Sequence, residues 1–350
     1  MTVTAVAGAA PTLPPAPLAV ADPTGQLRMG VYAGSVETVD WNGLAAMRAR
    51  GRLYRLSHHK RWWYAAAATR ELFVACAMVD VGYVANGFVY AVDLVERTRL
   101  LDRSLLGLPV QVSIGPRPAA GARAHFRTPG VELKFERASA AAPYRLRLRV
   151  GDTVRGEIEL AAEGTIPFTL ICPLPAGGIA NCTQKLAALP ASGEVQVAGR
   201  SFSLDGGLGG LDYTNGLLAR ETAWRWAFGF GRTEGGGAIG WNLVEGFNDA
   251  PGTEGEHVVW LDGVPHPVPA VRFGFDQHDP MLPWHLRSDD GAVDLTFAPI
   301  AGHFENHNLV VARSFFVQPA GLFAGTLRLG GRTITVADVP GVTEDQRVRW

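Results

Sequence analysis

The sequence has few cysteines, and they are scattered. Cys76, Cys172 and Cys182 are odd in number and form no CxxC pair. Neither a disulfide framework nor a cysteine-ligated zinc site is therefore indicated. We predict three reduced, structural thiols.

An excess of charge of one sign is also missing. The 350 residues contain 32 lysines and arginines against 33 aspartates and glutamates, with no block of like charge. A nucleic-acid partner therefore has no electrostatic support. The longest apolar region, residues 64–95, is interrupted by Arg70, Glu71, Asp80 and Asp93, so no segment meets the roughly 18-residue criterion for a membrane span. We predict a soluble protein.

Signature motifs of common enzyme classes are absent. The sequence contains no G-x-S-x-G elbow and no P-loop, so serine hydrolase and kinase-type chemistry have no support. Gly229, Gly231 and Gly235 approach a dinucleotide fingerprint, but a strand rather than a helix is predicted after that turn. We therefore expect no cofactor.

The N-terminus lacks the marks of a targeting segment. Residues 1–20 have no basic region and are broken by Pro11, Pro14, Pro15 and Pro17, which argues against a signal peptide. We expect residues 1–25 to form a disordered leader and the protein to be cytoplasmic.

Glycine and proline are abundant and lie between apolar segments of strand length. The chain has 42 glycines and 23 prolines, and turn signals recur about every 8 to 12 residues, as in sandwiches and barrels. No pattern for a helix of four turns is present. The predicted fold class is therefore all-β, with two antiparallel barrels or sandwiches packed together. The expected domains are residues 26–195 and 196–350, joined near residues 185–210.

Several strands are predicted from local pattern. Residues 52–57 and 62–68 are the first, and residues 72–84 and 88–95 are expected to pair through an Asn-Gly turn at residues 85–87. Residues 144–150 alternate apolar side chains with arginines, which predicts a strand with one face in water.

The most distinctive stretch runs from Asp212 to Asn248. Large rings alternate there with small residues, so one face of a predicted strand carries Trp224, Trp226, Phe228 and Phe230. The glycine-rich residues 233–237 predict a turn into a partner strand at residues 238–244. The unit is expected to be a curved hairpin.

Ionisable residues near these rings are candidate catalytic groups. Asp212 precedes the hairpin, Glu245 ends its second strand and Asp80 lies in an apolar strand, so each could have a raised pKa in an apolar cavity. Each could equally be a structural ion-pair partner of Arg220 or Arg225. The residues expected to bind a ligand are Trp224, Trp226, Arg220, Tyr213, Asn242 and His58, although a core role for His58 is also open.

His303, Glu305 and His307 form a second cluster. They are spaced to share one face of a strand, so a metal-ligand set is geometrically conceivable. The helical zincin motif is absent, and hydrogen bonding within a strand or loop is favoured. We predict no metal site.

Longer segments resemble a known family. They are KRWWYAAAATRELFVACAMVDVGYVANGFVYAVDL, SGEVQVAGRSFSL, LDYTNGLLARETAWRWAFG, GWNLVEGFN and LTFAPI. Together they resemble the bacterial domain of unknown function 2804, over most of the chain after the leader. More distantly, an SG-strand-G-strand order followed by Asp and a Trp-rich strand resembles carotenoid 1,2-hydratase and AttH-like proteins. Those proteins pair two lipocalin-like, calycin-type barrels, and the resemblance implies that fold.

The distant resemblance also implies a role for one residue. In the hydratase-like relatives the aspartate of an Asp-His motif is thought to protonate an alkene, and the matching position is Asp212. Tyr213 stands where those relatives have histidine.

Two functions are therefore considered, beside a third hypothesis, that the chain is a scaffold with filled barrels and no ligand. The first is a cofactor-independent lyase or isomerase, hydratase- or cyclase-like, acting on an apolar small molecule in a barrel cavity. Asp212 would be its general acid, and Trp224 and Trp226 would stabilise a cation. The alternative is a non-catalytic, lipocalin-like binding protein for a hydrophobic ligand. In both cases Asp212 is expected to face a cavity beside these rings, either paired with Arg220 or protonated.

Overall fold

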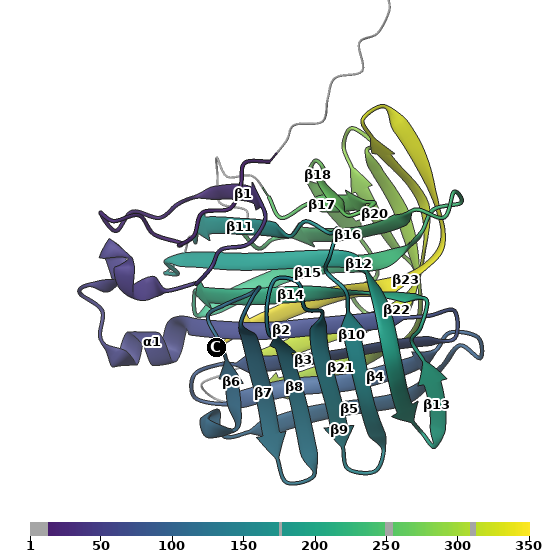
Figure 1. Ribbon diagram of the computed structural model, residues 1–350, viewed down its shortest axis with the longest axis horizontal. Coiled ribbons are helices and arrows are strands. Elements are labelled where there is room, and N and C mark those ends of the chain that lie inside the picture. Colours follow the sequence, from purple (N-terminus) through teal and green to yellow (C-terminus); the bar gives the residue numbers. More distant parts are fainter. Residues whose placement is uncertain (1–12, 175–176, 249–254, 309–312) are drawn as a thin grey trace, which may run out of the picture.

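The computed structural model describes residues 13–174, 177–248, 255–308 and 313–350, and it is almost entirely β-sheet (Figure 1). In this part of the chain the strands form two antiparallel sheets, of fourteen and nine strands. The first curls into a nearly closed barrel and the second into a half-barrel. The prediction of an all-β chain with two packed lipocalin-like barrels is confirmed.

The first sheet contains the strands up to residue 217. They are β1 (Gly30–Ala33), β2 (His59–Ala68), β3 (Leu72–Asp80), β4 (Ala85–Asp93), β5 (Thr98–Gly107), β6 (Val112–Ile114), β7 (Ala122–Thr128), β8 (Val131–Arg137), β9 (Tyr144–Val150), β10 (Val154–Leu160), β11 (Phe168–Pro173), β12 (Ala180–Val197), β13 (Arg200–Ser203) and β14 (Gly207–Leu217). The order across the sheet is β5-β4-β3-β2-β14-β12-β10-β9-β8-β7-β6, with β11 and β13 also on β12, and β1 on β11.

The second sheet contains the strands from residue 221 onward. They are β15 (Glu221–Arg232), β16 (Ala238–Glu245), β17 (Val258–Leu261), β18 (Val264–Pro267), β19 (Val271–Gly274), β20 (Trp284–Ser288), β21 (Val293–Asn308), β22 (Arg313–Leu329) and β23 (Arg332–Arg349). Their order is β18-β17-β16-β15-β23-β22-β21-β20-β19. The predicted hairpin is present as β15 and β16, paired from Arg225 and Glu245 to Arg232 and Ala238.

The helices are short. They are α1 (Arg52–His58) and the 3-10 turns η1 (Trp41–Gly43), η2 (Ala45–Met47) and η3 (Pro109–Gln111). Residues 52–57 were expected to be a strand, and this expectation is wrong. Leu53 and Leu56 are exposed, and the segment has no β-branched residue to favour a strand over a surface turn of helix. No helix in the described residues is long and apolar enough to cross a membrane.

Two further expectations are corrected at the N-terminal side. The turn between β3 and β4 lies at residues 81–84, where Gly82 has a positive φ of 93°, so Asn86 and Gly87 lie inside β4. Residues 13–25 are not a disordered leader, because Val20 is fully buried and Pro15, Ala19 and Ala21 form β-bridges. Residues 1–12 of that prediction lie outside the described residues.

The change of sheet falls between Leu217 and Glu221. The expected domain boundary after residue 195 lies inside β12, whose long pairing with β14 keeps residues 196–217 in the first sheet. The division of the chain into two domains stays a prediction.

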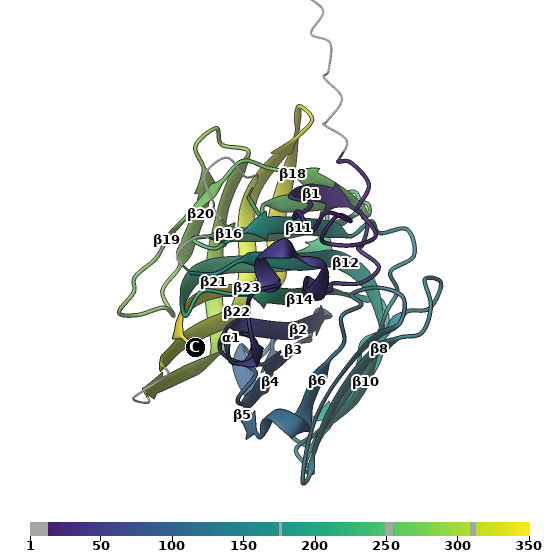
Figure 2. The same ribbon diagram turned by 90° about the vertical axis from the view of Figure 1, so that its left-hand side faces the viewer.

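Apolar side chains form three layers, because each central strand is buried on both faces. Figure 2 shows the second sheet (green to yellow) packed beside the first (purple to teal). On β2, Trp63 points into the first barrel and Tyr64 points between the sheets. On β15, Trp226 points between the sheets and Ala227 to the far face of the second sheet. The predicted alternation of residues 223–230 therefore places their rings between the sheets.

Candidate active site

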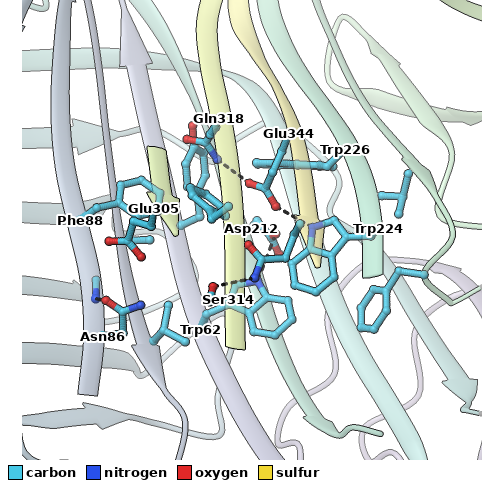
Figure 3. Close-up of a pocket in the computed structure, with 18 of the residues that line it drawn as sticks. Trp62, Asn86, Phe88, Asp212, Trp224, Trp226, Glu305, Ser314, Gln318 and Glu344 are labelled. Carbon is cyan, nitrogen blue, oxygen red and sulfur yellow. Dashed lines mark hydrogen bonds between the residues drawn. The ribbon is translucent and has the colours of Figure 1, made fainter. Parts of the chain in front are cut away.

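A cavity of about 110 Å³ lies between the two sheets (Figure 3). Its walls are largely aromatic and come from both sheets: Trp62, Tyr64 and Phe88 from the first, and Trp224, Trp226, Phe247, Phe316 and Trp350 from the second half of the chain. The expected position inside a barrel is corrected, because the first barrel is filled by buried rings such as Trp63, Phe135 and Tyr144. A cavity of this size admits a small ring or a branched alkyl group.

Strand register brings an ion pair to the cavity wall. Lys185 on β12 is the direct partner of Asp212 on β14 in the antiparallel ladder, so their side chains meet on one face. Lys185 Nζ lies 2.5 Å from Asp212 Oδ1 and 2.9 Å from Glu256 Oε1. The side chains of all three are nine-tenths or more buried. Burial lowers the pKa of Lys185, but Asp212 and Glu256 outweigh it and the pKa is raised.

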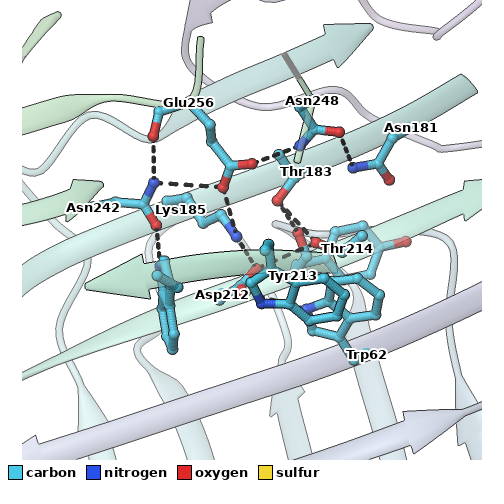
Figure 4. A network of polar contacts seen from close by, with 12 residues as sticks. Trp62, Asn181, Thr183, Lys185, Asp212, Tyr213, Thr214, Asn242, Asn248 and Glu256 are labelled. Carbon is cyan, nitrogen blue, oxygen red and sulfur yellow. Dashed lines mark hydrogen bonds and ion pairs between the residues drawn. The ribbon is translucent and has the colours of Figure 1, made fainter. Parts of the chain in front are cut away.

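Amide side chains extend this polar network away from the cavity (Figure 4). Asn248 Nδ2 donates to Glu256 Oε2 at 2.6 Å, and Asn181 Nδ2 donates to Asn248 Oδ1 at 3.1 Å. Asn242 Nδ2 donates to the Glu256 carbonyl at 2.9 Å, while its oxygen accepts from Trp226 Nε1 at 2.7 Å. The network therefore fixes both the carboxylates and one ring of the cavity wall.

Glu344 on β23 is a second acidic group on the cavity. Its oxygens accept from Trp224 Nε1 at 2.6 Å and from Gln318 Nε2 at 2.6 Å. Tyr90 in turn donates to Gln318 Oε1 at 2.9 Å. Burial raises the pKa of Glu344 to about 7, against the opposing effect of the Gln318 and Trp224 hydrogen bonds. Protonated Glu344 can keep its contact with Gln318 if the amide turns over and accepts the new hydrogen.

Charge balance also favours a protonated Glu344. Among the described residues that line the cavity, Lys185 carries the only ammonium, and Asp212 and Glu256 are both within ion-pair distance of it. A third buried carboxylate would add uncompensated negative charge in an apolar setting, which disfavours ionisation. Glu344 is therefore the group of this cluster best suited to carry a proton near neutral pH.

Glu305 on β21 lies on another wall of the cavity, near Phe88 and Asn86 (Figure 3). His303 Nε2 is 3.2 Å from Glu305 Oε1, and His303 Nδ1 is 2.6 Å from Asp102 Oδ1 on β5 of the first sheet. Burial lowers the pKa of His303, but Asp102 and Glu305 outweigh it and the pKa is raised. Burial raises the pKa of Glu305, but its contacts with His303 and Ser104 outweigh it and the pKa is lowered.

Three of the residues selected from sequence lie on this cavity, namely Asp212, Trp224 and Trp226. The ion pair of Asp212 is with Lys185 rather than with Arg220, because β12 and not the hairpin connection lies beside it. Trp62 Nε1 also donates to Asp212 Oδ2 at 3.3 Å. The catalytic and binding roles of these residues stay predictions.

The other two candidate acids lie away from the cavity. Glu245 pairs with Arg225 at 2.7 Å and is half-buried. Asp80 pairs with Arg61 at 2.5 Å and accepts from the Gly82 amide at 2.8 Å. Both are partners in structural ion pairs. Glu245 pairs with Arg225, one of the two partners considered from sequence, whereas Asp80 pairs with Arg61.

The remaining ligand-binding candidates are also outside the lining. Tyr213 points into the first barrel, where it packs on Trp63 and donates to the Gly115 carbonyl at 3.2 Å. Asn242 lies behind Trp226 and orients it.

The last two candidates lie at chain connections. His58 ends α1 and stacks on Tyr54 with ring centroids 4.0 Å apart. Arg220 connects β14 and β15, and its carbonyl accepts from the Trp350 amide at 2.9 Å. Neither is among the residues that line the cavity.

Sequence reasoning missed Lys185, Glu256, Glu344 and Trp62. Lys185 precedes the apolar run LAALP of β12, and a charged residue beside a buried strand pattern is the signal that selected Asp80 and could have selected it. Glu344 stands in the polar run TEDQR and carries no such signal. Glu305 was noticed only as a conceivable metal ligand. In the part of the chain that the structure describes, no group of three or more His, Cys, Asp or Glu side chains is arranged to hold a metal ion.

Comparison with known proteins places the chain in a family and identifies similar folds. The family described as Domain of unknown function (DUF2804) matches residues 14–350. A search of curated proteins gives no match. Kievitone hydratase from Nectria haematococca is similar in structure, with a TM-score of 0.51 and 14% identity over 89% of this chain and 96% of that one. CghA, solved with Sch210972, has a TM-score of 0.51 and 12% identity over 84% and 89%. A protein described as an AttH from Nitrosomonas europaea has a TM-score of 0.50 and 12% identity over 82% and 92%. At these identities the likeness concerns the fold.

Proposed function

The chain belongs to the DUF2804 family, and we propose that it is an acid-catalysing lyase or isomerase that acts on an apolar small molecule without a cofactor. The cavity between the sheets would bind the substrate, and Glu344 would deliver the proton. This assignment moves the general acid from Asp212 to Glu344. It keeps Asp212 in the site as a carboxylate held by Lys185.

One observation carries the proposal. Glu344 is a fully enclosed carboxyl group on the wall of an aromatic cavity, and its pKa is raised to about 7 by burial. A group of this kind holds a proton at neutral pH and is acidic enough to give it up. The ammonium of Lys185 is already paired with two other carboxylates, Asp212 and Glu256, and this pairing supports the same role for Glu344.

The surrounding groups suit a cationic intermediate. Protonation of a carbon–carbon double bond leaves positive charge on carbon, and the faces of Trp62, Trp224 and Trp226 can stabilise it. The Lys185–Asp212–Glu256 cluster carries one more carboxylate than ammonium, so its excess charge is also of the stabilising sign. Loss of a proton, or capture of water, would complete an isomerisation or a hydration. The name of kievitone hydratase, a similar fold, is consistent with this reaction class.

The experiment follows a proton from solvent to carbon. Isoprenol and geraniol, two apolar alkenes, are incubated with the protein in D2O, and deuterium on carbon and addition of water are read by mass spectrometry. Glu344→Gln should lower labelling by about 10²-fold or more while keeping the shape of the site. Glu157→Gln, on an exposed strand face with its side chain 71% exposed, is the matched control and should label like the wild type. Equal labelling by Glu344→Gln and the wild type would contradict the proposal.

A non-catalytic carrier is the second candidate. It is favoured by the hydrogen bonds that already occupy both oxygens of Glu344. A carrier would retain the two alkenes in native mass spectrometry, quench the fluorescence of the lining tryptophans and give no carbon label in either the wild type or Glu344→Gln.

A further inference from the structure

Glu305 is a further carboxylate on the cavity, beside Asp212, Glu256 and Glu344, in a position that the acid role of Glu344 does not use. β21, β22 and β23 are consecutive strands of the second sheet, and Glu305 and Glu344 both face the cavity from its two outer members. Glu305 is in register with Phe316 and Gln346, so Glu344 lies two strand spacings across and two residues along from it, roughly 12 Å between backbones. Phe316 and Gln318 of β22 line the cavity between the two carboxyl groups.

The contacts of Glu305 leave one of its oxygens with unused capacity. Its side chain is 4% exposed and within ion-pair distance of His303, but Glu305 Oε1 and His303 Nε2 make no hydrogen bond among the described residues. A buried carboxylate oxygen without a hydrogen-bond donor is costly unless something else supplies one. The nearest donor to this oxygen is His303 Nε2 at 3.2 Å, and the Glu305 side chain also lies on the cavity wall, where it can meet a bound molecule.

His303 is held firmly enough to position Glu305. Its ring is 1% exposed and packs against Phe88 at 4.6 Å and Phe316 at 5.7 Å between centroids. Asp102 fixes Nδ1 from the first sheet, and the Asp102 side chain is 22% exposed and also pairs with Arg99 at 3.2 Å. The row Glu305–His303–Asp102 thus runs from the cavity to solvent.

We propose that Glu305 is the general base of the cavity, positioned by His303 and Asp102, and that the site adds water to, or removes it from, a carbon–carbon double bond held between Glu305 and Glu344. The reaction direction and Glu344 as acid rest on the proposed function, whereas the base role of Glu305 does not.

The proposed step balances without any further reactant. In the hydration direction the double-bond electron pair takes the proton of Glu344, and a carbon–oxygen bond forms with water. That water gives one proton to Glu305, and Glu305 returns it to solvent once the product has left. Glu344 is reprotonated from solvent. Dehydration is the reverse.

The test uses a probe that needs only a base. 5-Nitrobenzisoxazole is flat and apolar, and a carboxylate removes its ring C–H proton while the nitrogen–oxygen bond breaks and a coloured cyanophenolate forms. The wild type should accelerate this elimination, and Glu305→Gln should lower the rate by about 10²-fold. Glu157→Gln again serves as the matched control and should leave it unchanged. No acceleration by the wild type, or equal rates for the wild type and Glu305→Gln, would overturn the proposal.

The pH profile separates Glu305 from Glu344 without relying on a variant that folds. Because the pKa of Glu305 is lowered and that of Glu344 is raised to about 7, a Glu305 base is already active at about pH 5.5, whereas a Glu344 base would switch on near neutrality. A wild-type rate that is flat from about pH 5.5 to 8 is expected. A rate that rises with a midpoint near 7 and is lost in Glu344→Gln would overturn the proposal.

Substitution of His303 tests whether His303 positions Glu305, and the pH at which the elimination begins is the quantity measured. The charged or titratable groups around this row are Asp102, Glu305, Arg99, His307 and Tyr90. His303→Gln removes the cation beside Glu305, so the onset of the elimination should move to higher pH; Asp102→Asn should move it in the same direction by weakening His303. A merely structural role would lower the rate equally at every pH, and this result would refute the positioning role. Because the probe does not require an acid, the base role of Glu305 can hold even if the deuterium test of Glu344 fails.

Discussion

Replacement of Lys185 by methionine should destabilise the fold strongly at neutral pH. The ammonium lies 2.5 Å from Asp212 and 2.9 Å from Glu256, and at an effective dielectric constant of about 20 each attraction is worth roughly 6 kcal/mol. Much of this offsets the cost of burying the ions, so removal of the one cation should reduce the free energy of unfolding by about 3 to 5 kcal/mol. Methionine keeps most of the side-chain volume, and a packing defect therefore contributes little.

The loss should depend on pH. Burial already raises the pKa of Glu256, and Lys185 opposes that rise, so the substitution raises it further. A carboxyl group whose folded pKa exceeds its unfolded value destabilises the fold increasingly as pH rises between the two. The cost of Lys185→Met should therefore be smaller at about pH 5, where Glu256 takes up a proton, than at about pH 7.5.

Urea unfolding followed by tryptophan fluorescence measures this free energy at both pH values. Lys134→Met is the matched control, because Lys134 pairs with Glu136 on an exposed strand face and has a side chain 42% exposed; it should cost about 0 to 1 kcal/mol. A cost for Lys185→Met as small as that of the control, or equal at the two pH values, would refute the reasoning.

Three further predictions follow from individual contacts. Glu344→Gln should remove a pH dependence of stability. The folded pKa of Glu344, about 7, lies above its unfolded value, so the wild type loses on the order of 3 kcal/mol of stability as pH rises from about 4.5 to 7. The variant should therefore melt at a higher temperature than the wild type at about pH 8 but not at about pH 5. A parallel pH dependence of both melting temperatures would contradict this. Gly210→Ala should reduce the free energy of unfolding by about 1 to 3 kcal/mol, because the added methyl group would meet the Phe228 ring across the two sheets; unchanged urea unfolding would refute the close approach. Tyr213→Phe should reduce the free energy of unfolding by about 1 kcal/mol, because the hydrogen bond to Gly115 is lost. Deuterium labelling of the alkenes should stay unchanged, since Tyr213 faces the first barrel. A loss of labelling would show that its placement outside the site is wrong.

The local sequence pattern was sufficient to predict which side chains of a single strand share a face. The alternation around Trp224 and Trp226 predicted a strand with its rings on one side, and the arginines of residues 144–150 lie in water as expected. The Asn-Gly pair at residues 86–87 shows the limit, because Gly82 already supplies the positive φ that the turn needs. A turn signal inside a strand cannot be recognised without the pairing partner.

The site itself depends on contacts between segments far apart in the sequence. Asp212 could be selected as an unusual acid beside aromatic residues, but its partner Lys185 is fixed by the register of β12 and β14. Glu344 joins the site because β23 pairs with β15 on one side and β22 on the other. Strand order of this kind is not encoded in the periodicity of any single strand.

The most direct test of the central claim is the protonation state of Glu344 in the intact protein. Infrared spectra of the wild type and Glu344→Gln in D2O, recorded from about pH 5.5 to 8.5, resolve the carbonyl stretch of a protonated carboxyl group. The wild type minus variant difference should show that band at acidic pH and lose it with a midpoint of about 7. A difference spectrum without the band across this range would mean that Glu344 is ionised throughout and cannot be the proton donor of the cavity.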